Sequence, residues 1–173
     1  MEAIGTRRVV RIGVIALFYA LLSFATSSLS CDDIPIRLAE MFLVLCLYSK
    51  DSVAAVTMGS FAVNVFGPHS AYEVIIGTLA TLTAGILICL MRNRVGSLGV
   101  IIAALISAAV NAPAVGAMIF LNGGGDIKTE VIRTAISEFF TVLIAGAALY
   151  YYVKRVKRMK TFLSDDVSVS AHG

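Results

Sequence analysis

The sequence predicts an all-α integral membrane protein with six transmembrane helices, and three observations lead to this fold class. First, 58% of the 173 residues are apolar, only 14% are charged and the mean hydropathy is +0.90, whereas soluble domains carry about 25% charged residues. Second, several apolar runs have the length of about 20 residues that a helix needs to cross a hydrocarbon core. Third, the basic residues fall mainly in alternate loops.

The predicted helices follow from the apolar runs, taken in order along the chain. Four long runs predict membrane spans over Val9–Leu29, Val74–Met91, Ser97–Leu121 and Val131–Val153. The last run qualifies if Arg133 and Glu138 are accepted inside a span. The stretch Ile36–Phe66 is apolar but broken at SKDS, so it predicts two short helices, each covering only about 20 Å. The total is six helices.

The distribution of Lys and Arg predicts the orientation in the membrane. If six helices span the membrane, most of the basic residues fall on one side: Arg7, Arg8, Arg11, Lys50, Arg92, Arg94, Lys154, Arg155, Lys157, Arg158 and Lys160. The positive-inside rule then puts both termini in the cytoplasm. The basic run after the last span is expected to meet anionic lipid headgroups rather than nucleic acid. Residues 1–158 are predicted to form a single six-helix membrane domain, and residues 159–173 a flexible cytoplasmic tail.

Several functional classes find no support in the sequence. There is no G-x-x-x-x-G-K-[ST] loop, so the chain is not expected to hydrolyse ATP by that route. Cys31, Cys46 and Cys89 show no C-x-x-C spacing and the two histidines are isolated, so no metal site is predicted. No nucleophile, base and orienting group stand at a recognisable spacing, and we therefore predict no catalytic residue.

Polar residues inside the apolar helices are the best candidates for a binding site, because a charge at membrane depth costs several kcal/mol unless it is paired or faces water. An apolar pocket with a few convergent polar groups is typical of a small-molecule site. The alternative is that Arg37 simply pairs with Glu40 at i, i+3, and that the asparagines bond between helices. The candidate substrate-binding residues are Arg37, Glu40, Asn64, Glu73, Asn111 and Glu138.

Two further groups of residues have a predicted role. The turn FGPHSAY between Asn64 and Glu73 is expected to close one wall of an outward-facing polar cavity. Phe66, Tyr72 and Phe139 are candidates for stacking on a flat ligand, with lipid contact or ordinary packing as the alternative. Small residues at spacing four allow helices to approach closely, and they occur at Ala16 and Ala20 and again at Gly77, Thr81 and Gly85.

Four segments resemble a known family, the QueT family of queuosine-precursor substrate-binding components of energy-coupling factor transporters. The similar segments are IRLAEMFLVLCLY, SFAVNVFGPHSAYEVIIGTLATLTAG, NAPAVGA and ISEFFTVLIAG. The resemblance runs from about Ile12 to Tyr152. The sequence departs from the family pattern at CDDI in the first external loop and at Glu73, where an aspartate is usual.

The resemblance implies a substrate-binding subunit of a bacterial plasma membrane importer, with a six-helix bundle typical of this class. Such a subunit is not an enzyme and has no cofactor of its own. It binds a small molecule from outside and joins one transmembrane coupling protein and two ATPases, which use the ATP. The resemblance also implies that Ala16 and Ala20 form the interface with the coupling protein.

The ligands implied by the resemblance are 7-deazaguanines such as preQ1, preQ0 or queuine. Glu73 and Glu138 are candidates for the ring N–H and amino edge, and Glu40 for the protonated amine of preQ1 or queuine. Asn64 and Asn111 would serve the ring carbonyl and the pyrrole nitrogen. The alternatives are a substrate-binding subunit for a different vitamin or nucleobase-like micronutrient, a structural or pore-forming membrane protein, and an intramembrane enzyme.

Overall fold

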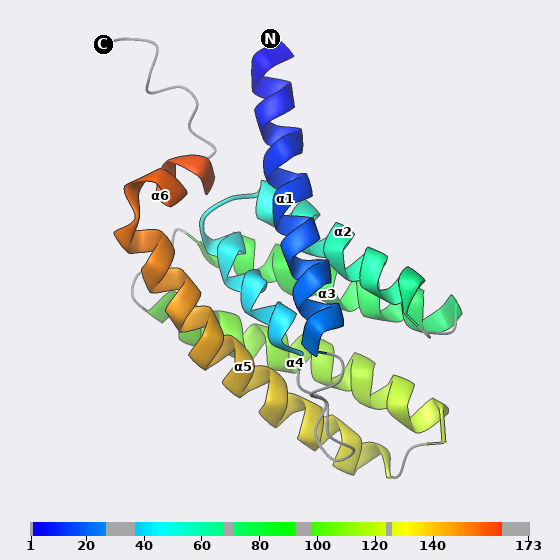
Figure 1. Ribbon diagram of the computed structural model, residues 1–173. Helices are drawn as coiled ribbons and strands as arrows, with labels where there is room; N and C mark the ends of the chain where they lie inside the picture. Colours follow the sequence, from blue (N-terminus) through cyan, green and yellow to red (C-terminus); the bar gives the residue numbers. More distant parts are fainter. Residues whose placement is uncertain (1, 27–36, 68–70, 93–97, 124–125, 164–173) are drawn as a thin grey trace.

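The computed structural model describes residues 2–26, 37–67, 71–92, 98–123 and 126–163, and the regular elements in these ranges are all helical (Figure 1). The predicted all-α class is confirmed for this part of the chain. The elements are α1 (Glu2–Thr26), η2 (Leu38–Leu47), α2 (Asp51–Phe66), α3 (Ala71–Met91), α4 (Gly99–Leu121), α5 (Ile127–Arg155) and α6 (Lys157–Leu163).

Four of these helices, α1, α3, α4 and α5, are long and apolar enough to cross a membrane. Apolar helices also occur at the two other predicted positions, but η2 and α2 are shorter. The predicted break between them is confirmed at residues 48–50. The count of six spans and the cytoplasmic location of both termini therefore stay predictions.

The short element η2 is a 3₁₀ helix rather than an α-helix. Its hydrogen bonds join residues three apart, as in Glu40 N to Arg37 O at 3.0 Å and Tyr48 N to Leu45 O at 2.9 Å. A 3₁₀ helix rises about 2.0 Å per residue, so the ten residues of η2 extend about 20 Å. This length agrees with the distance expected for each short helix.

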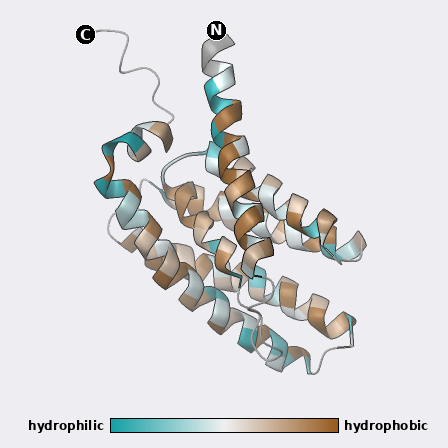
Figure 2. Ribbon diagram, viewed as in Figure 1, coloured by the Kyte–Doolittle hydropathy of each residue, from teal (hydrophilic) through white to brown (hydrophobic). Residues whose placement is uncertain are grey.

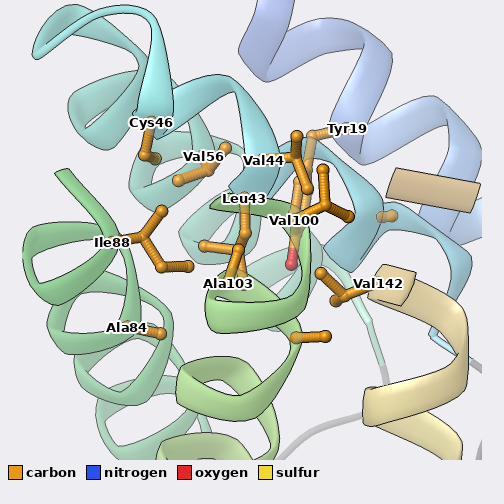
Figure 3. Packing of buried hydrophobic residues seen from close by; sticks show 12 residues of the cluster. Tyr19, Leu43, Val44, Cys46, Val56, Ala84, Ile88, Val100, Ala103 and Val142 are labelled. Carbon is orange, nitrogen blue, oxygen red and sulfur yellow. The ribbon is translucent and has the colours of Figure 1, made fainter. Parts of the chain in front are cut away.

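The core of the bundle surrounds η2, which contacts α1, α2, α3, α4 and α5. Leu43, Val44 and Cys46 of η2 are completely buried. Figure 3 shows the apolar side chains that pack around them. These neighbours come from all five surrounding helices and include Tyr19, Val56, Ala84, Ile88, Val100, Ala103 and Val142.

Large apolar side chains also lie on the outside of the bundle, and Figure 2 colours much of the helical ribbon as hydrophobic. Leu17, Ile75, Ile132 and Ile144, on three different helices, are all more than half exposed. Soluble monomers rarely expose continuous apolar surface on this scale. The outer surface is therefore suited to lipid.

The last helix, α6, lies at the same end of the bundle as the first turns of α1 (Figure 1). Leu163 of α6 is buried in a cluster with Ile15 and Val153, and Arg11 Nη1 donates to Phe162 O at 3.1 Å. The boundary predicted at residue 158 thus falls inside α6, and residues 159–163 belong to a helix that packs on the bundle. The rest of the predicted tail, residues 164–173, is outside the described ranges.

Candidate functional site

A buried ionic cluster lies where η2, α4 and α5 meet. Glu40 and Glu138 are 0% and 2% exposed, and Arg37 lies between them. Arg37 Nη2 is 3.2 Å from Glu40 Oε1, and Arg37 Nη1 is 3.9 Å from Glu138 Oε1. The pair expected between Arg37 and Glu40 is present, and it extends to a second carboxylate. Two carboxylates thus share one guanidinium group.

Hydroxyl and amide groups of α1 and α4 complete the cluster. Tyr19 donates its hydroxyl to Glu40 Oε1 at 2.8 Å, and Ser107 donates to Glu138 Oε2 at 2.8 Å. Asn111 Nδ2 donates to Ser107 Oγ at 3.4 Å. All three side chains are buried. The cluster therefore contains four of the predicted residues, from η2 and its N-terminal flank, α4 and α5.

Sequence reasoning missed Tyr19 and Ser107. A signal existed for Ser107, because it precedes Asn111 by four residues and so shares its face of α4. Tyr19 stands in a long apolar run, where a tyrosine fits ordinary packing. The sequence around it therefore gave no signal that its hydroxyl bonds to Glu40.

Three buried acceptor atoms of the cluster have no hydrogen-bond partner among the described residues. They are Glu40 Oε2, Glu138 Oε1 and Asn111 Oδ1. Buried polar atoms are nearly always hydrogen-bonded, and each unsatisfied one costs about 1–3 kcal/mol. The cluster therefore has acceptors to offer, and a molecule that presents several N–H donors suits it chemically.

Asn64 belongs to a different polar group, between α2 and α3. Its Nδ2 donates to Ser60 Oγ and to Thr78 Oγ1, each at 3.4 Å, and Ser60 Oγ is 3.1 Å from Thr81 Oγ1. The helices approach closely here, because a Cβ on Gly77 would lie 2.9 Å from Asn64 Nδ2. These contacts match the alternative expected for Asn64, a bond between helices.

Glu73 lies in the first turn of α3, where it accepts a hydrogen bond from Asn122 Nδ2 at the end of α4. Tyr72 donates its hydroxyl to Asn122 Oδ1. Glu73 thus links α3 to α4 in a partly exposed position. The cavity wall predicted for this turn includes residues 68–70, and the first external loop includes residues 31–34; both segments are outside the described ranges.

The three candidates for stacking differ in their surroundings. Phe66 is 80% exposed at the end of α2, and Tyr72 is exposed beside Asn122. Phe139 packs against the apolar core and precedes Phe140, with ring centroids 5.5 Å apart. Of the three, Phe139 is the immediate neighbour of the ionic cluster along the chain, next to Glu138.

A second ionic group, which sequence reasoning did not anticipate, lies at the α6 end of the bundle. Asp51 is 4% exposed and accepts from Arg8 Nε at 2.7 Å and from Arg11 Nη2. Arg11 also holds the backbone of α6 through Phe162 O. This group joins α1, α2 and α6, so its contacts are structural.

Ala16 and Ala20 are partly exposed along one edge of α1. On one side of them lie the buried Ile15 and Tyr19, and on the other lies the exposed Leu17. The edge is therefore accessible to another helix. Its role as an interface stays a prediction.

Comparison with known proteins identifies a family. No curated protein and no solved structure matches the chain. The model of the QueT transporter family matches residues 9–155, a range that contains every residue of the ionic cluster around Arg37. The chain therefore belongs to the QueT transporter family.

Proposed function

We propose that this chain captures a 7-deazaguanine precursor of queuosine from outside and delivers it inward when docked on a coupling protein and two ATPases. Its family makes the chain a transporter component rather than an enzyme. The family and the four long apolar helices make it a multi-pass protein of the plasma membrane. Substrate-binding components of this family generally bind small ligands and work with energy-coupling modules.

The observation that carries the proposal is the set of three unsatisfied acceptors, Glu40 Oε2, Glu138 Oε1 and Asn111 Oδ1. A 7-deazaguanine presents a ring N–H beside an exocyclic amino group, and one carboxylate can accept from both. We assign this edge to Glu138 because its Oε1 is buried and has no hydrogen-bond partner among the described residues, whereas Glu73, the other candidate, is partly exposed and accepts from Asn122. The remaining acceptors suit the pyrrole N–H and an amine on the ligand.

The charge of the cluster favours a cationic ligand. Arg37 carries one positive charge and contacts two carboxylates, Glu40 and Glu138. A ligand amine that is protonated would balance the second carboxylate and so offset the cost of burying it. PreQ1 and queuine carry such an amine, whereas preQ0 carries a nitrile. We therefore expect tighter binding of preQ1 or queuine.

Docking on the coupling protein is assigned to the exposed edge of α1 at Ala16 and Ala20. Small side chains let two membrane helices approach closely, and the partial exposure of both alanines supports this assignment. ATP hydrolysis by the partner ATPases would supply the energy for release of the ligand inside.

Calorimetric titration of the purified chain tests the proposal. The panel contains preQ1, preQ0, queuine, guanine, riboflavin, thiamine and biotin. We expect tight binding of a deazaguanine that falls roughly tenfold to a hundredfold in Glu138→Gln, as for the loss of a hydrogen bond to a charged group. Glu130→Gln is the matched control and is expected to keep the affinity, because Glu130 pairs with Arg133 and takes no part in the ionic cluster.

Two results would contradict the proposed ligand. Heat from a vitamin but not from any deazaguanine would indicate a substrate-binding subunit for another micronutrient. No heat from any compound would favour the structural or pore-forming alternative.

A further inference from the structure

We propose that Tyr19 is a positioning residue of the binding site, which holds Glu40 so that its second oxygen stays available to the ligand. The inference rests on the proposed function, because it takes the ionic cluster as the ligand site. Tyr19 is on α1, whereas the other members of the cluster belong to η2 and its flank, α4 and α5. The first helix would thus take part in ligand recognition.

The two oxygens of Glu40 are in different situations. Glu40 Oε1 accepts from the Tyr19 hydroxyl at 2.8 Å and lies 3.2 Å from Arg37 Nη2. Glu40 Oε2 has no hydrogen-bond partner among the described residues. Both donors are therefore on one oxygen, and the other oxygen is left for a ligand.

Without the Tyr19 hydroxyl, Glu40 could bind Arg37 through both of its oxygens. Arginine and carboxylate groups often form two parallel hydrogen bonds, one to each oxygen. If Glu40 turned to bind Arg37 in this way, Oε2 would no longer be free to accept from a ligand. The hydroxyl of Tyr19 opposes that rotation, because turning the carboxylate would break a buried hydrogen bond.

Tyr19 is itself held in place by its surroundings. It is 1% exposed, and a Cβ added to Gly59 of α2 would lie 2.8 Å from Tyr19 Cβ and 2.9 Å from the ring. On η2, the ring of Phe42 lies with its centroid 6.3 Å away. A side chain confined in this way keeps one rotamer, so its hydroxyl has a fixed position relative to Glu40.

The test is Tyr19→Phe, which keeps the ring and removes the hydroxyl. We expect its affinity for the deazaguanine that the wild type binds most tightly to fall about tenfold. Tyr48→Phe is the matched control, since the Tyr48 hydroxyl donates to Tyr150 O at 2.9 Å and contributes nothing to the cluster. We expect the control to bind as the wild type does.

A second comparison separates positioning from general structural support. In a Glu40→Gln background, Tyr19→Phe is expected to cause no further loss of affinity, because the acceptor that Tyr19 positions is already changed. Gly59→Ala provides an independent variant, since the added methyl must displace Tyr19, its Cβ as well as its ring, while the hydroxyl remains. It should also weaken binding about tenfold, and only when Glu40 is present.

The outcomes distinguish this inference from the proposed function. If the wild type binds a deazaguanine and Tyr19→Phe binds it equally well, the inference is wrong and the proposed function stands. An equal loss with and without Glu40 would also overturn it. If the wild type binds no compound of the panel, the proposed function is wrong and this inference fails with it.

Discussion

Arg37 is the cation between the two carboxylates of the ionic cluster. We therefore expect its replacement to destabilise the protein more than the replacement of one carboxylate. Arg37→Met would leave Glu40 and Glu138, both almost fully buried, with no guanidinium group between them. Glu138→Gln would instead leave one carboxylate facing one guanidinium group. The first change should therefore lower the free energy of unfolding much more than the second.

The distances give the size of the effect. At an effective dielectric constant of about 20, the separations of 3.2 Å and 3.9 Å from Arg37 correspond to attractions of about 5 and about 4 kcal/mol before desolvation. Removing one partner of a buried pair costs about 3–5 kcal/mol net, which we expect for Arg37→Met. Glu138→Gln loses one attraction and also one repulsion from Glu40, and its amide oxygen still accepts from Ser107. We expect it to cost less than about 1 kcal/mol.

Reversible unfolding in mixed detergent micelles, followed by circular dichroism without ligand, measures the difference. Lys128→Met is the control, because Lys128 is exposed in the first turn of α5, where a substitution usually changes stability by at most about 0.5 kcal/mol. If Glu138→Gln destabilised the protein as much as Arg37→Met, the argument from charge balance would be refuted.

Three further predictions concern other parts of the bundle. Gly116→Ala should lower the free energy of unfolding by about 1–3 kcal/mol or more, since the new Cβ would meet Val131 atoms at 2.6–2.9 Å. Gly13→Ala is the control and should cause no loss, because its new Cβ meets nothing within 4 Å. Equal effects of the two variants in the same unfolding assay would contradict this prediction. Asp51→Asn should lower the free energy of unfolding by about 3–5 kcal/mol, because Arg8 and Arg11 of α1 lose their buried partner. An unchanged unfolding curve would show that these two ion pairs contribute little to stability. Ala16→Trp should abolish cellular uptake while the isolated chain keeps its ligand affinity, and uptake at the wild-type rate would exclude this edge of α1 as the docking surface.

The positions of the helices could be predicted from hydropathy, but not all of their ends or their winding. α1 begins at Glu2, well before the predicted start at Val9, because polar and basic residues continue a helix without adding to its apolar run. The apolar run 38–47 fits an α-helix and a 3₁₀ helix equally well. Its actual hydrogen bonds depend on the helices that pack around it.

The candidate site was predictable only in part, because its contacts also depend on which helices pack together. The spacing of Arg37 and Glu40 on one helical face predicts their contact directly. Hydropathy indicates that Asn64 and Glu138 are both inside helices, but not which neighbouring helix each one faces. Asn64 donates to the Thr78 hydroxyl of α3, whereas Glu138 accepts from Ser107 of α4.

The 3₁₀ winding of η2 has a mechanical consequence for its position in the centre of the bundle. Rewinding its ten residues as an α-helix would shorten the element by about 5 Å, because the rise falls from about 2.0 Å to about 1.5 Å per residue. The turn per residue would fall by about 20°, so Glu40 would swing by about 140° relative to Leu47. Such rewinding would move Glu40 away from Tyr19 and Glu138 and so break the contacts of the ionic cluster.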